Sequence, residues 1–173
     1  MKLNPYGEQL GGRNAIDVIA ATPAQLNKFH ETLGAAGMKE SLAPGKWTAR
    51  QILCHLADCE VVFAYRLRQT LAEGHHTIQP FDQDQWANPY AAYEAQEALA
   101  LFSAARQWNV KLARAASPEQ LAKKVTHPER GELTFQTIVE TMAGHDLNHL
   151  QQLEAIAARV APAGKSTSAP GSR

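Results

Sequence analysis

The sequence ETMAGHDLNHLQQLEAI, residues 140–156, has the spacing of a helix that faces the core of a helical bundle. Side chains at alternating intervals of three and four form the seam that such a helix presents to its neighbours. Extended by one turn at its start, this seam comprises Phe135, Ile138, Met142, His145, His149, Gln152 and Ile156. Burying an imidazole without a partner costs about 1 to 3 kcal/mol. The two histidines therefore either have partners or face an open, hydrated site.

Three further helical segments precede this one and predict an all-α protein. The first opens at Thr22, which can act as N-cap, with Pro23 at the first helical position and Gln25 completing a capping box. It runs to Gly37, and residues 15–20 could add a helical turn upstream. We therefore place the start of the first helix at the Thr22 cap.

The remaining boundaries follow from the same signals. A second helix starts at the cap Thr48, with Gln51 as its capping-box partner, and stops at Gly74. A third spans about residues 90–116, and the fourth about residues 134–160, each estimated from helical periodicity. Between them, SPEQLAKK predicts a short capped turn and VTHPERGELTF a small hairpin.

Length and composition predict one domain. The chain has 173 residues, of which 45% are hydrophobic, and domains cluster near about 100 to 200 residues. We expect the helical domain to cover residues 1–160. Residues 161–173 are rich in proline, glycine and serine, a composition typical of a disordered tail.

Charge and hydropathy argue against large classes of partner. Lysine plus arginine and aspartate plus glutamate both number 17, so no overall basic character favours nucleic acid or an anionic membrane. No apolar run approaches the about 18 residues of a membrane span, and the first residues lack the apolar stretch of a secretory signal. Cys54 and Cys59 lie five apart in a helix, about 7.5 Å along its axis, too far for an easy disulfide. These features predict a cytoplasmic protein with reduced thiols.

The second helix adds a third inward imidazole. Ile52, Cys59 and Arg66 recur at helical spacing there, and His55 lies on or beside the same apolar face. One histidine from one helix and an i, i+4 pair from another suit a transition metal such as Zn, Ni or Fe, because neutral imidazoles bind these ions at about 2.0 to 2.1 Å. Three protein ligands leave one coordination position open, which is the pattern of a catalytic metal site.

Other interpretations of these residues remain open. Histidines on a half-apolar face are often hydrogen-bonded core residues without a ligand. HDLNH resembles the HExxH of zinc proteases, but Asp146 replaces the glutamate that acts as general base. A di-iron site needs several inward glutamates and two Glu-x-x-His motifs, and only Glu73 and His76 have that spacing. Cys59 is either a ligand, a nucleophile or a small core residue, and Asp58 either orients His55 or is a solvated charge.

Four segments in register resemble the DinB/YfiT-like family of metal-binding proteins: GKWTARQILCHLADCE, TIQPFDQDQWA, HPERGELT and HDLNHLQQLEAI. The resemblance implies a four-helix bundle with one long crossover connection, commonly dimeric. It also implies that a divalent metal is held by His55, His145 and His149. Other positions that carry the family's residue types are Trp47, Asp58, Arg66, Asp82, Trp86 and His127. Cys59 and Asp146 depart from the family pattern.

The resemblance implies several related functions. Members include thiol S-transferases, thiol-dependent isomerases and proteins named as hydrolases, so we expect transfer of a small-molecule thiol to a small electrophile, with hydrolysis as the alternative. A metal would lower the pKa of the thiol or of water. Asp58 and Arg66 are catalytic candidates. Arg66 either anchors an anionic group or forms a salt bridge, and the loop with Asp82 and Trp86 either walls the pocket or plugs it.

A noncatalytic protein is the rival hypothesis. In that case a dimer binds a metal or ligand that only stabilises the bundle. We expect a homodimer in either case, chiefly because the family resemblance implies one. The first and third helices give weaker support, and the third carries more apolar surface than one seam needs, at Leu99, Phe102, Trp108 and Leu112.

Overall fold

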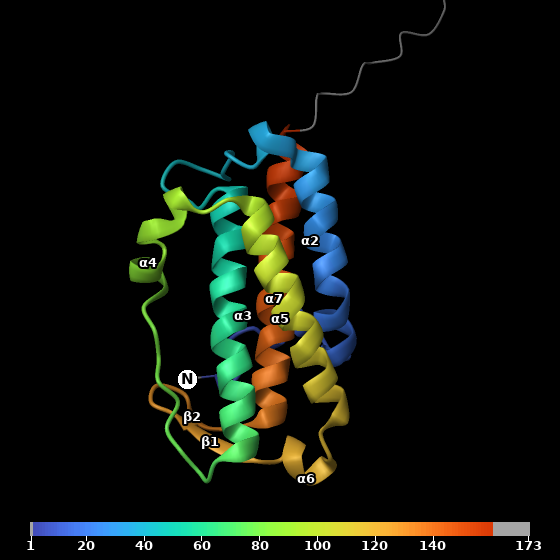
Figure 1. Ribbon diagram of the computed structural model, residues 1–173, viewed down its shortest axis with the longest axis vertical. Coiled ribbons are helices and arrows are strands. Elements are labelled where there is room, and N and C mark those ends of the chain that lie inside the picture. Colours follow the sequence, from blue (N-terminus) through green and yellow to red (C-terminus); the bar gives the residue numbers. More distant parts are fainter. Residues whose placement is uncertain (1, 161–173) are drawn as a thin grey trace, which may run out of the picture.

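The computed structural model describes residues 2–160, and its four long helices pack side by side as a bundle (Figure 1). These helices are α2 (Ala15–Gly37), α3 (Ala49–Ala72), α5 (Ala95–Ala115) and α7 (Phe135–Val160). The short elements are α1 (Gly7–Leu10), α4 (Gln83–Trp86), the 3-10 helix η1 (Asn88–Ala92), α6 (Pro118–Leu121), β1 (Lys124–His127) and β2 (Gly131–Thr134). The predicted all-α four-helix bundle is confirmed.

The connection between α3 and α5 sets the topology. It leaves the lower end of α3, runs up the outside of the bundle through α4, and reaches the top where α5 begins (Figure 1). Consequently α3 and α5 run in the same direction, and α2 and α7 run opposite to them. This is the long crossover that the family resemblance implied, and it brings α4 beside α3.

Thr22 is not the cap of the first helix, which includes the upstream residues 15–20 that the sequence left open. Asn14 is the N-cap of α2, and its side chain accepts hydrogen bonds from the backbone N–H groups of Ile16 and Asp17. Thr22 lies inside the helix, buried, and donates to Asp146 at 2.8 Å. Pro23 is tolerated there because the carbonyl of Ile19, four residues earlier, accepts a hydrogen bond from a side chain of α5 instead.

The other boundaries agree more closely with the sequence. Thr48 and Gln51 form the predicted capping box of α3, and Ser117 caps the short α6. The hairpin exists as β1 and β2, which pair antiparallel. The third long helix begins at Ala95, five residues later than predicted, because Tyr90 lies in η1 with its side chain buried.

A layer of polar side chains divides the core. One apolar cluster fills one end of the bundle with residues of α3 and α7 such as Leu53 and Leu153, and another fills the end near the hairpin with residues such as Phe135 and Met142. The buried polar residues are chiefly Thr22, His55, Glu60, Arg106, Asn109, His145, Asp146 and His149. Within residues 2–160, no helix is long and apolar enough to cross a membrane. The tail predicted at 161–173 lies outside the described residues.

Candidate functional site

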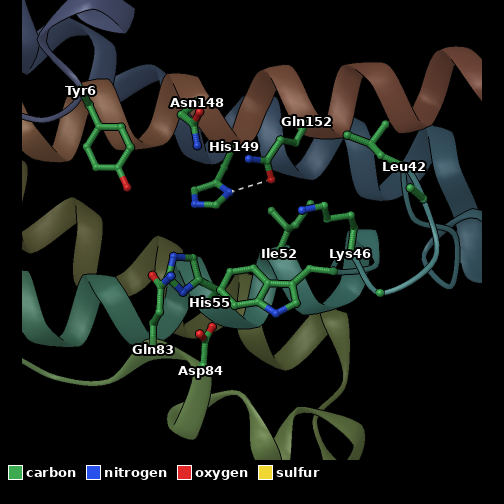
Figure 2. A pocket seen from close by; sticks show the side chains of 13 residues that line it. Tyr6, Leu42, Lys46, Ile52, His55, Gln83, Asp84, Asn148, His149 and Gln152 are labelled. Carbon is green, nitrogen blue, oxygen red and sulfur yellow. Dashed lines mark hydrogen bonds between the residues drawn. The ribbon is translucent and has the colours of Figure 1, made fainter.

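Three imidazoles meet in this polar layer. His55 projects from α3, and His145 and His149 project from successive turns of α7. All three side chains are buried, and their ring centroids lie 4.5 to 5.1 Å apart. Figure 2 shows His55 and His149 approaching each other from the two helices. The structure therefore brings together the three residues that the sequence predicted as ligands.

The nitrogen atoms of these rings converge. Nε2 of His145 lies 3.0 Å from Nε2 of His55 and 3.1 Å from Nε2 of His149. One ring nitrogen carries either a proton or a lone pair, so His145 cannot form good hydrogen bonds with both neighbours. Two ligands at about 2.0 to 2.1 Å from a tetrahedral ion lie about 3.4 Å apart. A single divalent ion bound by these nitrogens would resolve the competition at His145, because each ring would then direct a lone pair at the ion.

The surroundings also favour metal-binding forms of the rings. Nδ1 of His149 lies 3.2 Å from Oε1 of Gln152, to which it donates, so the lone pair of a neutral ring resides on Nε2 (Figure 2). Burial lowers the pKa of His55 to about 3, with a further contribution from the charge of His149. Burial likewise lowers the pKa values of His145 and His149. The rings are therefore neutral at pH 7, the form that binds a transition metal.

Cys59 lies beside the same cluster. Its Sγ is 3.5 Å from Nε2 of His55, and together with His145 the three residues place ligand atoms within 4.8 Å of one another. Burial, with smaller contributions from nearby carboxylates, raises the pKa of this thiol. Cys59 is therefore a protonated neighbour of the rings unless a metal draws off its proton. Cys54 is also free, as the sequence predicted.

Asp146 takes part in a buried polar network beside the histidine cluster. Its carboxylate accepts hydrogen bonds from Arg106 and from Thr22. Arg106 also donates to Glu60 at 2.6 Å, and Glu60 accepts a second hydrogen bond, from Asn109. All five side chains are buried. This network joins all four long helices beside the imidazoles, so it fixes α3 relative to α7 and thereby the spacing of the three rings.

A pocket of about 530 Å³ opens onto His55 and His149. Trp47 forms one wall, with its ring centroid 4.6 Å from that of His55 and 6.4 Å, stacked, from that of His149. Tyr6 approaches from the opposite end of the pocket in Figure 2. The remaining lining residues are Leu42, Ala43, Gly45, Lys46, Ile52, Gln83, Asp84, Asn148 and Gln152. The cluster is thus accessible to a small molecule.

Some predicted residues lie in other positions. Asp58 accepts a hydrogen bond from the hydroxyl of Tyr90 at 2.8 Å, and in the described part of the chain it has no hydrogen bond to His55. Asp82 is the N-cap of α4. Trp86 packs against Phe81 with the two rings tilted at 50°, and 42% of its surface is exposed. The crossover does wall the pocket, but through Gln83 and Asp84.

Arg66 and His127 meet in a separate small cavity of about 20 Å³. Arg66 donates to the backbone oxygen of Gln79 at 2.9 Å. Among the described residues it forms no salt bridge, which was one of the two roles left open for it. His127 is buried at the end of β1. The two residues therefore lie together, near the hairpin.

Sequence reasoning missed Tyr6. Its ring lies 5.2 Å, edge to face, from that of His145, because the segment around α1 crosses α7 at Gly144. A Cβ atom at Gly144 would meet the backbone oxygen of Tyr6 at 2.3 Å. The small pair Ala143–Gly144 before His145 was the available signal, since a glycine inside a helix often permits close backbone approach.

Comparison with known proteins gives the same fold and family. The model of the DinB superfamily matches residues 19–153. A "putative metal-dependent hydrolase" of Oceanobacillus iheyensis is 28% identical over 83% of this chain and 84% of its own, and one of Bacillus cereus is 25% identical over 84% of each. YfiT from Bacillus subtilis, described as a probable metal-dependent hydrolase with an unusual four-helix bundle topology, superposes with a TM-score of 0.78 at 23% identity, covering 84% of this chain and 85% of its own. The chain belongs to the DinB superfamily.

Proposed function

We propose that this protein is a metal-dependent enzyme that activates a small nucleophile at the cluster of His55, His145 and His149. The convergence of three buried Nε2 atoms beside an accessible pocket carries this proposal. A Zn, Ni or Fe ion bound there would supply Lewis-acid chemistry, lowering the pKa of a thiol or water in its open position. The names of the relatives support metal dependence.

A thiol is the nucleophile that we propose, and transfer to a small electrophile is the reaction. Hydrolysis also calls for a side chain within hydrogen-bond reach that passes a proton to the leaving group, yet the carboxylates nearest the rings are already engaged: Asp58 with Tyr90, and Glu60 and Asp146 with Arg106. A thiol starts from a pKa near about 8.5, so metal binding alone suffices to ionise it. Trp47, Leu42 and Ile52 give the pocket an apolar wall for the electrophile.

Hydrolysis is the second candidate, favoured by the names of the relatives. Among the described residues that line the pocket, Asp84 is the one carboxylate, and it would have to serve as the base. The test is a screen of the purified protein with several thiols and electrophiles, each with and without a chelator. Transferase activity should need both metal and thiol, whereas a hydrolase would turn over without thiol. Turnover that is insensitive to chelation would overturn both proposals.

We also propose a homodimer in the cytoplasm. Leu99 and Phe102 are buried in the bundle and so cannot contribute. Trp108 is 70% exposed, and it is accompanied by exposed Leu101 on α5 and by Val61 and Tyr65 on the neighbouring α3. This outward face supports association of two copies. Light scattering that finds only an 18.9 kDa species at micromolar concentration would contradict it.

A further inference from the structure

The small cavity near the hairpin has an unusual lining. It is bounded by Arg66 of α3, His127 of β1 and Arg130 of the hairpin turn, and otherwise by Phe63, Ile78, Leu133, Ile138 and Thr141. Thr141 uses its hydroxyl proton to bond the backbone oxygen of Thr137. The cavity therefore brings two guanidinium groups and an imidazole together, and its lining from residues 2–160 contains no carboxylate.

The protein leaves donors free at this cavity. Nδ1 of His127 accepts a hydrogen bond from the backbone N–H of Glu129 at 3.2 Å, so the neutral ring carries its proton on Nε2. Among residues 2–160, neither that Nε2–H nor the guanidinium of Arg130 has a protein acceptor. His127 is only 5% exposed, yet its Nε2 is not among the fully buried unpaired atoms of residues 2–160, so this donor faces the accessible space of the cavity.

Like charges also oppose one another here. Burial lowers the pKa of Arg66, and the charge of Arg130 lowers it further. Burial, Arg130 and Arg66 together lower the pKa of His127, and only the exposed Glu129 acts in the opposite direction. Bringing two cations to one partly buried cavity is unfavourable unless an anion compensates them.

The cavity lies next to the histidine cluster. Phe63 lines it, and the ring of Phe63 is 6.3 Å from that of His145. Thr141 precedes His145 by one helical turn, about 6 Å along α7. A volume of about 20 Å³ is close to the space that one water molecule needs, so the cavity admits an oxygen of an anionic group and excludes a whole substrate.

We propose that Arg66, His127 and Arg130 bind one anionic group, a carboxylate or phosphate, and that this group belongs to the small molecule whose other end reaches the histidine cluster. Arginine suits this role because its planar donors match the two oxygens of a carboxylate. The first half of the proposal stands on the cavity alone. The second half rests on the proposed function.

The first experiment tests the anion site by itself. Titration calorimetry of the full chain in chloride-free buffer measures binding of acetate and of inorganic phosphate. Arg130→Gln should weaken binding at least about 10-fold, the size of one lost charge-assisted contact of about 1.5 kcal/mol. Arg114→Gln, at an exposed arginine of α5, should change it less than twofold. Arg130→Lys should fall between. Equal binding by wild type and Arg130→Gln, or none by wild type, would overturn the site.

The second experiment asks whose anion it is. Mercaptocarboxylates of increasing length are compared with mercaptoalcohols of the same length for binding to the metal-loaded protein. If the anionic group is part of the ligand, one length of mercaptocarboxylate binds more tightly than its alcohol, and Arg130→Gln removes that preference. Acetate binding without any such preference leaves a site for free anions and overturns the second half. If no thiol binds while acetate still does, thiol activation is wrong and so is the second half of the proposal. The anion site itself would remain supported.

Discussion

Arg106 and Asp146 form a buried ion pair one residue along α7 from His145. Arg106 also pairs with Glu60, which follows Cys59 on α3. One guanidinium thus holds two carboxylates from different helices, in a layer where water cannot replace it. Removing one partner of a buried pair typically costs about 3 to 5 kcal/mol, because the remaining charge is left without compensation.

We therefore expect Arg106→Met to lower the free energy of unfolding by about 3 to 5 kcal/mol, measured by urea denaturation of the metal-free protein. Arg114→Met is the matched control, since Arg114 is exposed, and it should change stability by less than about 0.5 kcal/mol. A loss below about 1 kcal/mol for Arg106→Met would mean that the network does not hold the bundle together.

The ligand prediction is tested at His145. Because its Nε2 lies between those of His55 and His149, His145→Ala should weaken metal affinity by more than about 100-fold, beyond the loss typical of residues that only orient a ligand. The domain should still fold, since its two apolar clusters form without the ion. Elemental analysis gives the metal content and circular dichroism the helix content. His75→Ala, at an exposed histidine, should retain the metal; equal retention by His145→Ala would remove the site.

The variant Cys59→Ser distinguishes whether this thiol is a nucleophile, a metal ligand or neither. The raised pKa of Cys59 leaves it protonated in the metal-free protein, and three imidazoles already supply a ligand set. We expect the variant to be folded, metal-loaded and active, with a change of less than about threefold in turnover, or about 0.6 kcal/mol. Abolished turnover with the metal retained would identify Cys59 as the nucleophile, and loss of the metal would identify it as a ligand.

The lowered histidine pKa values predict an acid-sensitive metal-free protein. In the unfolded chain a histidine binds a proton below about pH 6.5, whereas folded His55 does so only near pH 3. The unfolded state therefore binds more protons between these values, and stability falls as pH falls, by up to about 1.4 kcal/mol per pH unit for each such histidine. Urea denaturation between pH 7 and 4 should show a smaller slope for His55→Gln than for wild type. Identical slopes would contradict neutral burial of this ring.

Sequence patterns were most informative where one helix determines the outcome. The i, i+4 spacing of His145 and His149 and the capping box at Thr48 are local features, and both appear as predicted. Thr22 has a good local cap signal, yet Asn14 caps the helix because Thr22 is needed by Asp146 across the bundle. Tyr6 and Arg130 reach their places through the crossing of α1 over α7 and through the hairpin, contacts that helical periodicity does not encode.

Gly144 offers a test of the contribution of Tyr6 to the site. A Cβ atom there would meet the backbone oxygen of Tyr6 at 2.3 Å and the Cβ of Tyr6 at 2.6 Å, and rotating the side chain of Tyr6 moves neither atom. Gly144→Ala should therefore displace the Tyr6 segment while favouring helix α7 by about 1 kcal/mol of intrinsic propensity. Crystallography or the fluorescence of Trp47 would report an enlarged pocket, and ligand affinity should fall. Gly74→Ala, where a Cβ meets nothing within 4 Å, controls for the added methyl group. If Tyr6 stays packed on His145 in Gly144→Ala, the predicted displacement is wrong. If Tyr6 moves away and ligand affinity is unchanged, Tyr6 is no part of the binding surface.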